Sequence, residues 1–553
     1  MQSETKQCQS CKKEFRIEPE DFAMYEKQGI PSSDKCPVCR WKYLLAFWVF
    51  GRFRIGKSAL SGKQIITVLP ENTSFPIYDR EEFISDKWDP MTHGQDYDSN
   101  RSFFEQLVEL QSKVPHPHQT GIQNTNCQWA DDVWESKNCY LCRSLGWCED
   151  LSYGYRTLRC KNSIDLTYCF DTEYSYDCLN CFNCYKVKYA FNARQCIDSM
   201  FLYDCRNVQN CFMCWNLRNK KYHIYNKPYS KEAYQEKLKT FDTRSYDGIY
   251  NLKKEFSDLM AREALHRANF NTNIVNSTGN FLTDCRNCHS AYFIEESENC
   301  RYFFRGLKSK ESIDLVGCGY NENTAVSCAA IWTYGCLGLL WSSNCRYSFY
   351  LEACEECENC FGCVGLRKKN HCILNKQYSE NDYKALTVKI KEDMQKRGEW
   401  GKFMPLSMAY SGYNLSLANI IFPENEEFIR KMGGKWDILP IPKFENTISG
   451  ADLPGRIDDV KDDIARQRVI CPETGLSYNI APHELAFYKA QGIPLPRLHF
   501  DLRTLNRFRP MTLMIYPQRG ICIFCRKEIE HYYPSELGYK KIACVTCYNN
   551  EVI

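Results

Sequence analysis

Two pairs of closely spaced cysteines lie near each end of the chain. Within each pair two residues separate the cysteines, which is the spacing of a zinc knuckle. Two knuckles together offer four thiolates to one tetrahedral Zn²⁺ at about 2.3 Å each, and the metal supplies folding energy that a small module lacks. The sequence therefore predicts two zinc ions per chain, one held by Cys8, Cys11, Cys36 and Cys39 and one by Cys522, Cys525, Cys544 and Cys547.

The two ends of the chain are copies of one tandem module. CQSCKKEFRIEPEDFAMYEKQGIP from Cys8 aligns with CPETGLSYNIAPHELAFYKAQGIP from Cys471 at a constant shift of 463 residues. This alignment predicts two ribbons in each module. In the first ribbon of the C-terminal module, Cys471 remains alone, because the other three ligand positions hold Thr474, His499 and Leu502.

The second ribbon of the N-terminal module has no cysteine. With small gaps, the knuckles at Cys522 and Cys544 align with a hydroxyl and carboxylate set, Ser58, Ser61, Asp79 and Glu82. Two hydroxyls and two carboxylates make a poor zinc site. We therefore expect this ribbon to fold by packing alone. The chain as a whole should then bind two zinc ions rather than four.

The segment GRFRIGKS, residues 51–58, matches the phosphate-loop pattern G-x4-G-K-S. A working phosphate loop must open a helix whose first amides face the phosphates. Here SALSGKQIITV follows, and its glycine and β-branched residues predict a turn and a strand. We interpret the match as chance on a ribbon without its ligands.

The central cysteines recur at multiples of nine residues, which helical packing does not favour. The sequence therefore predicts a mainly β fold with α segments, whose centre is a parallel β-solenoid built from nine-residue half-coils with a cysteine ladder inside. Twelve of the 25 central cysteines follow Asn or Asp, residues that tolerate the left-handed conformation of sharp corners. The ladder runs through Cys160, Cys169, Cys178, Cys196, Cys205 and Cys214, and again through Cys300, Cys318, Cys336, Cys345, Cys354, Cys363 and Cys372.

Each central block ends in a second duplication, at a shift of 149 residues. Two interpretations of its cysteines stay open. Repeat periodicity favours stacked, buried thiols. A further metal site at the end of each block is the alternative, because a histidine, itself a zinc-ligand type, matches one cysteine; its candidate ligands are Cys211, Cys214, His223, Cys360, Cys363 and Cys372.

Composition limits the class of protein. The chain has 553 residues, a net charge of +3 and 34 cysteines, so whole-molecule attraction to nucleic acid or to an anionic membrane is not implied. The N-terminus has no apolar core typical of a signal peptide, and no apolar run is long enough to span a bilayer. We therefore expect a cytoplasmic protein, in which a reducing environment favours metal ligation or free thiols over disulfides.

The duplications predict the domain order. We expect an N-terminal tandem ribbon module at 1–95, a helical linker at 96–126, the first cysteine-rich block at 127–228, a helical insertion at 229–270, the second block at 271–377, a helix at 378–397, a mixed segment at 398–467 and the C-terminal tandem module at 468–553.

With these motifs, the chain resembles a family of cysteine-rich zinc-ribbon proteins from candidate-phyla bacteria with strongly reduced genomes, automatically labelled Caib/baif family proteins. SDKWDP at Ser85, NRSFFEQLVELQSKVP at Asn100, LRNKKYHIYNKPYS at Leu217 and FPENEE near Gly412 carry the resemblance, with the ribbons and the Asn-Cys repeats. The resemblance implies cysteine knuckles in all four ribbons, from which this chain departs in two. The label implies coenzyme A transfer, which no motif in this sequence supports.

Three functions remain open. The first is a non-catalytic zinc-binding scaffold that presents a solenoid surface to a partner, protein or RNA; no small-molecule substrate is evident. The second is a nucleic-acid-binding ribbon protein, such as one associated with RNA or the ribosome, in which basic residues among aromatics meet phosphates: Arg52, Arg54, Lys57, Arg503, Arg507 and Arg509. The third is a thiol, iron–sulfur or nucleotide-dependent enzyme. The sequence contains no HExxH and no G-x-S-x-G motif, and their absence argues against a catalytic role.

Overall fold

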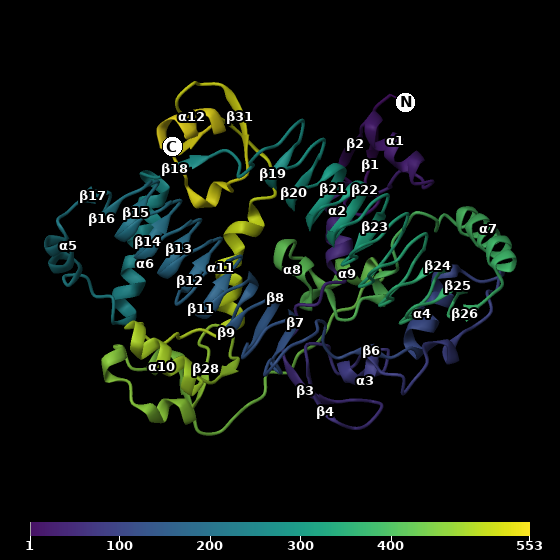
Figure 1. Ribbon diagram of the computed structural model, residues 1–553, viewed down its shortest axis with the longest axis horizontal. Helices are drawn as coiled ribbons and strands as arrows, with labels where there is room; N and C mark the ends of the chain where they lie inside the picture. Colours follow the sequence, from purple (N-terminus) through teal and green to yellow (C-terminus); the bar gives the residue numbers. More distant parts are fainter. Residues whose placement is uncertain (1, 553) are drawn as a thin grey trace. The chain divides into compact units, whose positions relative to one another are not determined.

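The computed structural model describes residues 2–552, and their side chains except at 512 and 513 (Figure 1). The fold is mixed α/β, with about 31% of the residues in strands and about 26% in helices. The chain forms two compact units. Unit 1 contains residues 1–119 and 269–438, and unit 2 contains residues 120–268 and 439–553. Each unit therefore combines one cysteine-rich block with one of the two end modules.

The elements of unit 1 surround a stack of short strands. Its helices are α1 Pro19–Lys27, α2 Pro37–Leu45, α3 Arg80–Ile84, α4 Phe103–Lys113, α7 Glu380–Lys396, α8 Leu417–Ile421 and α9 Glu426–Lys431. Its strands are β1 Glu4–Gln7, β2 Glu14–Ile17, β3 Arg54–Lys57, β4 Gln64–Thr67, β5 Ile77–Tyr78, β6 His116–Pro117, β19 Gly279–Thr283, β20 Ala291–Glu295, β21 Glu298–Leu307, β22 Lys310–Gly319, β23 Ala325–Cys328, β24 Glu358–Phe361, β25 Asn370–Ile373 and β26 Lys376–Gln377.

Unit 2 contains a stack of the same kind. Its helices are α5 Lys231–Leu238, α6 Tyr246–Arg262, α10 Pro482–Gln491, α11 Phe500–Leu513 and α12 Val545–Val552. Its strands are β7 Ala130–Trp134, β8 Cys142–Gly146, β9 Glu149–Ser152, β10 Tyr155–Leu158, β11 Lys161–Thr167, β12 Tyr176–Leu179, β13 Tyr185–Phe191, β14 Ile197–Tyr203, β15 Gln209–Trp215, β16 Lys221–Ile224, β17 Lys227–Pro228, β18 Leu265–Arg267, β27 Thr447–Ser449, β28 Arg468–Ile470, β29 Ser477–Tyr478, β30 Gln518–Ile521, β31 Glu528–His531 and β32 Lys541–Ala543.

Every third residue of the central blocks has a left-handed backbone. From Asp132 to Tyr225, φ is positive at each third position without a break, and the same holds from Asp284 to Leu374. Asn, Asp and Gly tolerate this conformation best, although bulkier residues such as Tyr168 also adopt it here. Every cysteine from Cys127 to Cys214 directly follows such a residue. The expected corner role of the Asn-Cys and Asp-Cys pairs is therefore present in the backbone.

The strands pair in parallel with a shift of twelve residues. Ile164 pairs with Tyr176, Cys178 with Ala190 and Leu202 with Cys214. The prediction of nine-residue half-coils is therefore wrong, because two nines would give a shift of eighteen. Nine and twelve are both multiples of the three-residue unit, and for this reason the cysteine spacing alone suggested the wrong coil. The sheet of unit 2 is also mixed rather than wholly parallel, since β16 and β17 pair antiparallel.

Main-chain carbonyls accept hydrogen bonds from the inward thiols and hydroxyls. The residue after each left-handed position points inward, where Cys178 and Cys205 have no exposed surface. The Cys178 thiol donates to the carbonyl of Tyr176 at 3.4 Å and to that of Val187, nine residues ahead, at 3.4 Å. Ser175 uses its hydroxyl similarly, donating to Glu173 and accepting from the Val187 amide. A small side chain with one donor therefore suits many inward positions, while residues such as Val187 and Leu202 fill others by packing alone.

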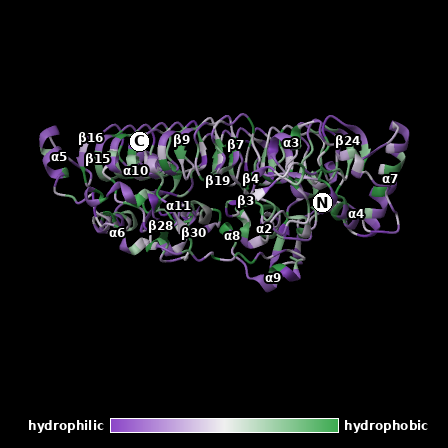
Figure 2. Ribbon diagram, turned by 90° about the horizontal axis from the view of Figure 1, so that it is seen from below, coloured by the Kyte–Doolittle hydropathy of each residue, from purple (hydrophilic) through white to green (hydrophobic). Residues whose placement is uncertain are grey.

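Matching polar caps and helices close both stacks. The Asn226 carboxamide accepts from the amide of Trp215 at 3.0 Å, and Asn375 accepts from Val364 at 2.8 Å. Ser230 and Ser379 then cap α5 and α7 by accepting from main-chain amides. Figure 2 shows α7 mostly in hydrophilic colours, which fits a helix that lies on the end of its stack. No helix within residues 2–552 is both long and apolar enough to cross a membrane.

A buried acid marks each end module. Asp21 in α1 and Glu484 in α10, equivalent by the shift of 463, accept from the amides of Glu18 and Ala481 in capping boxes. Burial raises the pKa of Glu484 from 4.5 to about 7, although Tyr153, the Ala481 amide and the charge of Arg503 oppose that rise.

We expect Asn192→Val to destabilise unit 2 by about 2–4 kcal/mol. Asn192 has a φ of 58°, and its side-chain carboxamide donates to the carboxylate of Asp204 at 2.8 Å. A β-branched residue at this position therefore adds backbone strain and removes a buried hydrogen bond. Hydrogen exchange of the β13 and β14 amides would measure the change. Asn192→Gly keeps the backbone angle and should cost less; equal exchange in both variants and the parent chain would contradict this prediction.

We expect the stability of unit 2 to fall as the pH rises from about 4.5 to about 7. The pKa of Glu484 is higher in the folded state than in the unfolded chain. Its contribution to the free energy of unfolding is therefore fully present below pH 4.5 and is lost as the pH rises to about 7. Glu484→Gln should keep the capping hydrogen bond and remove about 2–3 kcal/mol of this pH dependence. Urea unfolding of both proteins at pH 5 and pH 8 tests it; parallel pH profiles would refute it.

Candidate metal centres

The first candidate centre begins in the turn between β1 and β2. The Cys8 amide donates to the Lys13 carbonyl at 2.9 Å, and the Lys12 amide donates back to the Cys8 carbonyl at 3.0 Å. Lys12 has a φ of 62°. This tight turn directs the thiols of Cys8 and Cys11 toward the same side.

A helix start supplies the other two thiols. Cys36 is the N-cap of α2, Cys39 lies in its first turn, and the Cys36 amide donates to the sulfur of Cys8 at 3.3 Å. The four sulfur atoms of Cys8, Cys11, Cys36 and Cys39 all lie within 4.8 Å of one another. Cys8 and Cys39 are buried, so the protein encloses the inner side of the cluster.

The C-terminal module repeats this arrangement between β30 and β31. The Cys522 amide donates to Lys527, the Arg526 amide donates to the Cys522 carbonyl, and the Cys544 amide donates to the sulfur of Cys522 at 3.3 Å. The sulfur atoms of Cys522, Cys525, Cys544 and Cys547 also lie within 4.8 Å of one another. Among the described residues, these two sets are the groups of Cys, His, Asp and Glu that could hold a metal ion.

Ionisation in both clusters favours a cation. Hydrogen bonding with the Cys39 thiol lowers the pKa of Cys36 to about 5 and raises the pKa of Cys39. Burial would raise the pKa of Cys522, but main-chain amides of Cys544, Cys525 and Phe524 lower it to about 6. Each cluster therefore holds a thiolate at neutral pH, and binding a metal would release the protons of the remaining thiols.

The ribbon with Ser58, Ser61, Asp79 and Glu82 keeps the same backbone. The Ser58 amide donates to Lys63 at 2.8 Å, the Gly62 amide donates to the Ser58 carbonyl, and the Asp79 amide donates to the Ser58 hydroxyl at 3.1 Å. The Ser58 hydroxyl also donates to Glu82, and hydrogen bonds from Ser58 and Ser61 lower the pKa of Glu82. Hydrogen bonds thus connect the two halves where two of the other ribbons have four sulfur atoms.

The Cys471 ribbon also keeps the turn. The Cys471 amide donates to Leu476 at 2.9 Å, and Gly475, with a φ of 69°, donates back to the Cys471 carbonyl. Burial would raise the pKa of Cys471, but hydrogen bonds from the His499 amide and from Thr474 lower it. Leu502 lies in α11, at the position equivalent to the fourth ligand. The Cys471 thiol and the Thr474 hydroxyl thus stand where two of the other ribbons have a pair of cysteine ligands.

The further metal ligands considered from the sequence lie inside the stacks. Cys214 donates to the carbonyls of Phe212 and His223, and Cys363 donates to those of Phe361 and Cys372. The His223 ring contacts the Lys221 carbonyl at 2.7 Å. Within residues 2–552, the set Cys211, Cys214 and His223 and the set Cys360, Cys363 and Cys372 do not form a group that could hold a metal ion. Their contacts favour the interpretation as buried, hydrogen-bonded thiols.

The basic residues proposed to contact nucleic acid are placed unequally. Arg503 and Arg507 are nearly buried and pair with Asp165 at 2.9 Å each. Arg54 donates to the carbonyls of Leu69 and Pro70. Lys57 and Arg509 are exposed, and Arg52 is partly buried. Half of this set therefore stabilises the fold.

The phosphate-loop match lies on a hairpin. Arg54–Lys57 forms β3, which pairs antiparallel with β4, and the turn after Ser58 closes back on Lys63. No helix opens at Ser58 in this described segment, so the amides that a phosphate requires are absent there. The predicted turn and strand are present, and this geometry favours the interpretation of the match as chance.

Sequence inspection missed one row of residues. Phe170, Phe182, Arg194, Arg206 and Arg218 lie twelve residues apart and become neighbours on one side of the unit 2 stack. They form no basic run in the sequence. A search for repeats of side-chain type at a spacing of twelve would have found them.

Comparison with known proteins adds no family assignment. A scan against protein-family models found no match, and a search among curated proteins found none either.

We expect the replacement of Ser58, Ser61, Asp79 and Glu82 together by cysteine to raise bound zinc from two to three ions per chain. The turn and the main-chain hydrogen bonds of a knuckle are already present, so only the ligands are missing. Elemental analysis after gel filtration measures the ratio. The matched control replaces the same four residues by alanine, and a folded cysteine variant with unchanged zinc would contradict the prediction.

Proposed function

We propose that this protein is a non-catalytic zinc-binding scaffold that presents the outer surface of two β-solenoids to a macromolecular partner. The observation that carries the proposal is the convergence of four sulfur atoms within 4.8 Å in each of two ribbons. Both clusters lie at the turn of a hairpin and the start of a following segment, which are the parts of a structural zinc site.

Zinc fits these donor sets better than other metals. Four thiolates around one ion, without an open position, are typical of structural zinc or of a mononuclear iron site. A small two-stranded ribbon such as β1–β2 has little core of its own, so a metal would supply a large part of its stability. The zinc-ribbon family that the sequence resembles is consistent with this choice.

The scaffold role is supported by the central blocks. Their twelve-residue shift, left-handed corners and inward cysteines are the features of a narrow β-solenoid, in which each coil contacts its neighbours. Outward side chains recur in straight rows at that spacing, as from Phe170 to Arg218. Solenoids with such rows typically present an extended surface to a partner.

The central thiols do not suggest catalysis. Burial raises the pKa of Cys178, Cys205 and Cys328 well above 9. Hydrogen bonds lower the pKa of others, such as Cys211 and Cys372, but those thiols have no exposed surface. A reactive cysteine needs exposure and a lowered pKa. These thiols are better explained as packing groups of the solenoid interior.

We expect the purified chain to contain two zinc ions, and Cys11→Ser to contain one. Loss of one thiolate ligand weakens a four-sulfur site, so the β1–β2 ribbon should exchange its amide hydrogens faster while unit 2 stays unchanged. Elemental analysis and hydrogen exchange measure both effects. Cys471→Ser serves as the matched control and should retain two zinc ions. Iron in place of zinc, or no loss of metal in Cys11→Ser, would overturn the proposal.

A further inference from the structure

One outward row of the unit 2 stack changes from aromatic to basic. Phe170, Phe182, Arg194, Arg206 and Arg218 follow one another through parallel main-chain bridges, each twelve residues after the last. Neighbouring strands lie about 4.8 Å apart, so the row extends about 19 Å along the stack. We call these five residues the Phe-Arg row.

The three arginines have too few acidic partners. Arg206 and Arg218 share the carboxylate of Asp204, at 3.4 and 3.2 Å. Arg194 donates to the Asn180 carbonyl at 2.8 Å, which is a neutral partner. Three guanidinium groups therefore lie beside one carboxylate, and the row carries an excess of positive charge.

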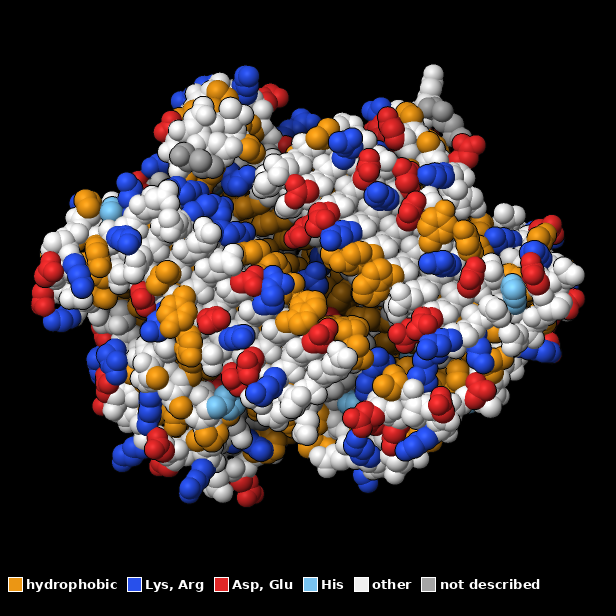
Figure 3. All heavy atoms as spheres, in the orientation of Figure 1, with side chains coloured by type: hydrophobic (Ala, Val, Ile, Leu, Met, Phe, Trp, Pro, Cys, Tyr) orange, Lys and Arg blue, Asp and Glu red, His pale blue; other side chains and the backbone are white. Residues whose placement is uncertain are grey.

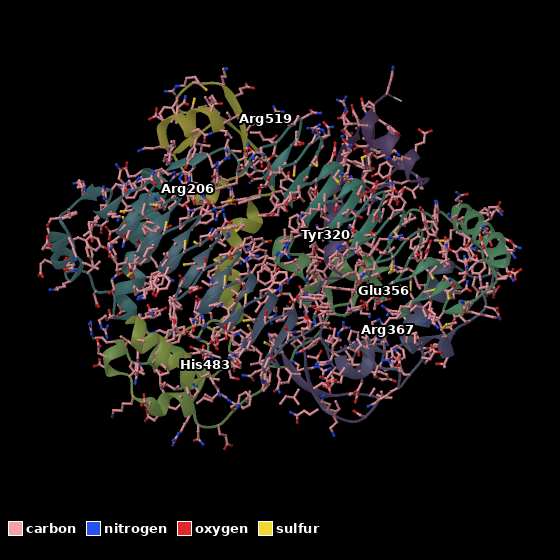
Figure 4. The ribbon with its side chains drawn as sticks, viewed as in Figure 1. Arg206, Tyr320, Glu356, Arg367, His483 and Arg519 are labelled. Carbon is pink, nitrogen blue, oxygen red and sulfur yellow. The ribbon has the colours of Figure 1, made fainter. Side chains whose placement is uncertain are left out.

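Electrostatic repulsion acts within the row. Burial and the charge of Arg206 lower the pKa of Arg194 to about 10. Burial, Arg218 and Arg267 lower the pKa of Arg206, although Asp204 opposes that shift. Figure 3 shows Lys and Arg side chains gathered over this end of the stack, and Figure 4 places Arg206 there. An anion bound along the row would relieve the repulsion.

The other end of the row presents aromatic rings. The rings of Phe170 and Phe182 lie 4.6 Å apart, and the guanidinium of Arg194 lies 3.4 Å from the centre of the Phe182 ring. On the adjoining side of the stack, Tyr174 and Tyr185 contact each other at 5.6 Å and are 37% and 38% exposed. Flat, partly exposed rings thus lie beside the cationic part.

Amide side chains line the corner next to the row. Asn183, Gln195, Asn207 and Asn219 occupy successive left-handed positions there and are exposed. Asn207 donates to Asn219 at 2.7 Å. Carboxamides at this corner offer donors and acceptors to the edge of an unpaired base.

We propose that the Phe-Arg row binds single-stranded nucleic acid. Arg194, Arg206 and Arg218 would contact consecutive phosphates, while bases stack on Phe170, Phe182 and the two tyrosines. An acidic peptide would also neutralise the arginines but would make no use of the rings. A duplex would keep its bases stacked inside and away from them. The proposal goes beyond the zinc scaffold and rests on unit 2 residues that lie outside both metal clusters.

Fluorescence anisotropy with a labelled single-stranded RNA 20-mer of mixed sequence tests the proposal on the full chain. Three phosphate contacts predict a slope of log affinity against log salt of about −2. Arg194→Gln with Arg206→Gln should weaken binding at least tenfold and reduce the slope to about −1. This pair avoids Arg218, whose hydrogen bonds to Asp204 and Tyr548 support the fold.

A matched control removes equal charge elsewhere in unit 2. Lys461 and Arg466 are exposed in the segment that packs on α10, so changing both to Gln should leave RNA binding within twofold of the parent chain. Equal weakening in this control, or no RNA binding at 50 mM salt, would overturn the proposal. Circular dichroism and zinc content, unchanged in both variants, separate a lost site from a lost fold or a lost metal.

The stacking half of the proposal has its own readout. Phe182→Leu keeps an apolar side chain but removes the ring, and should weaken RNA binding about tenfold without changing the salt slope. Competition with poly-glutamate and with an RNA duplex of the same length completes the test. If either competes as well as the single strand, or if Phe182→Leu binds normally, the row is not a single-strand site.

Discussion

The left-handed backbone at every third residue determines the rest of the central architecture. A coil of twelve residues with one such residue in every three has four corners, and between corners there is room for one inward side chain. Each non-glycine residue in this conformation costs about 1–2 kcal/mol locally. Parallel hydrogen bonds to the coils on both sides offset that cost, so the conformation persists only while the stack is continuous. Most inward positions hold Cys, Ser, Thr, Ala, Val or Leu, while Ile294 and Phe303 are larger residues inside the second block.

Much of this could be predicted from the sequence, though not the size of the coil. Cysteine after Asn or Asp indicated sharp corners and a buried ladder, and both are present in the structure. The period was wrong because inward positions recur every three residues, so cysteines nine apart, such as Cys160 and Cys169, mark three such steps rather than half of a coil. The coil length is visible instead in outward rows such as Phe170 and Phe182, which sequence inspection did not compare. The two four-cysteine sets were easier to find, because their ligands lie close in sequence within each half-site.

The four ribbons show two ways of holding one backbone. In all four, a residue with positive φ stands four positions after the first ligand position, at Lys12, Gly62, Gly475 and Arg526. Two ribbons connect their halves through sulfur atoms that could share a metal ion. The Ser58 ribbon uses a carboxylate and hydroxyls instead, and Lys63 pairs with Asp79 at 3.2 Å. Hydrogen bonds can replace the ligands there because the main-chain amide of Asp79, in the second half, still donates to the Ser58 hydroxyl in the first half. The fold therefore constrains the turn more strongly than it constrains the ligands.

The same stack shows why the arginine row needs an explanation beyond folding. Residues twelve apart are neighbours, and the stack pairs opposite charges at this spacing in two places that the row can be compared with. Lys137 contacts Glu149 at 3.2 Å, and Arg159 contacts Asp171 at 2.6 Å. Like charges at such neighbouring positions destabilise a sheet, and alternation avoids the cost. The sequence of Arg194, Arg206 and Arg218 does the opposite on three successive coils, with a single carboxylate between them. A site whose charges repel each other in the free protein gains that energy back when an anion binds, which is a property expected of an anion-binding surface.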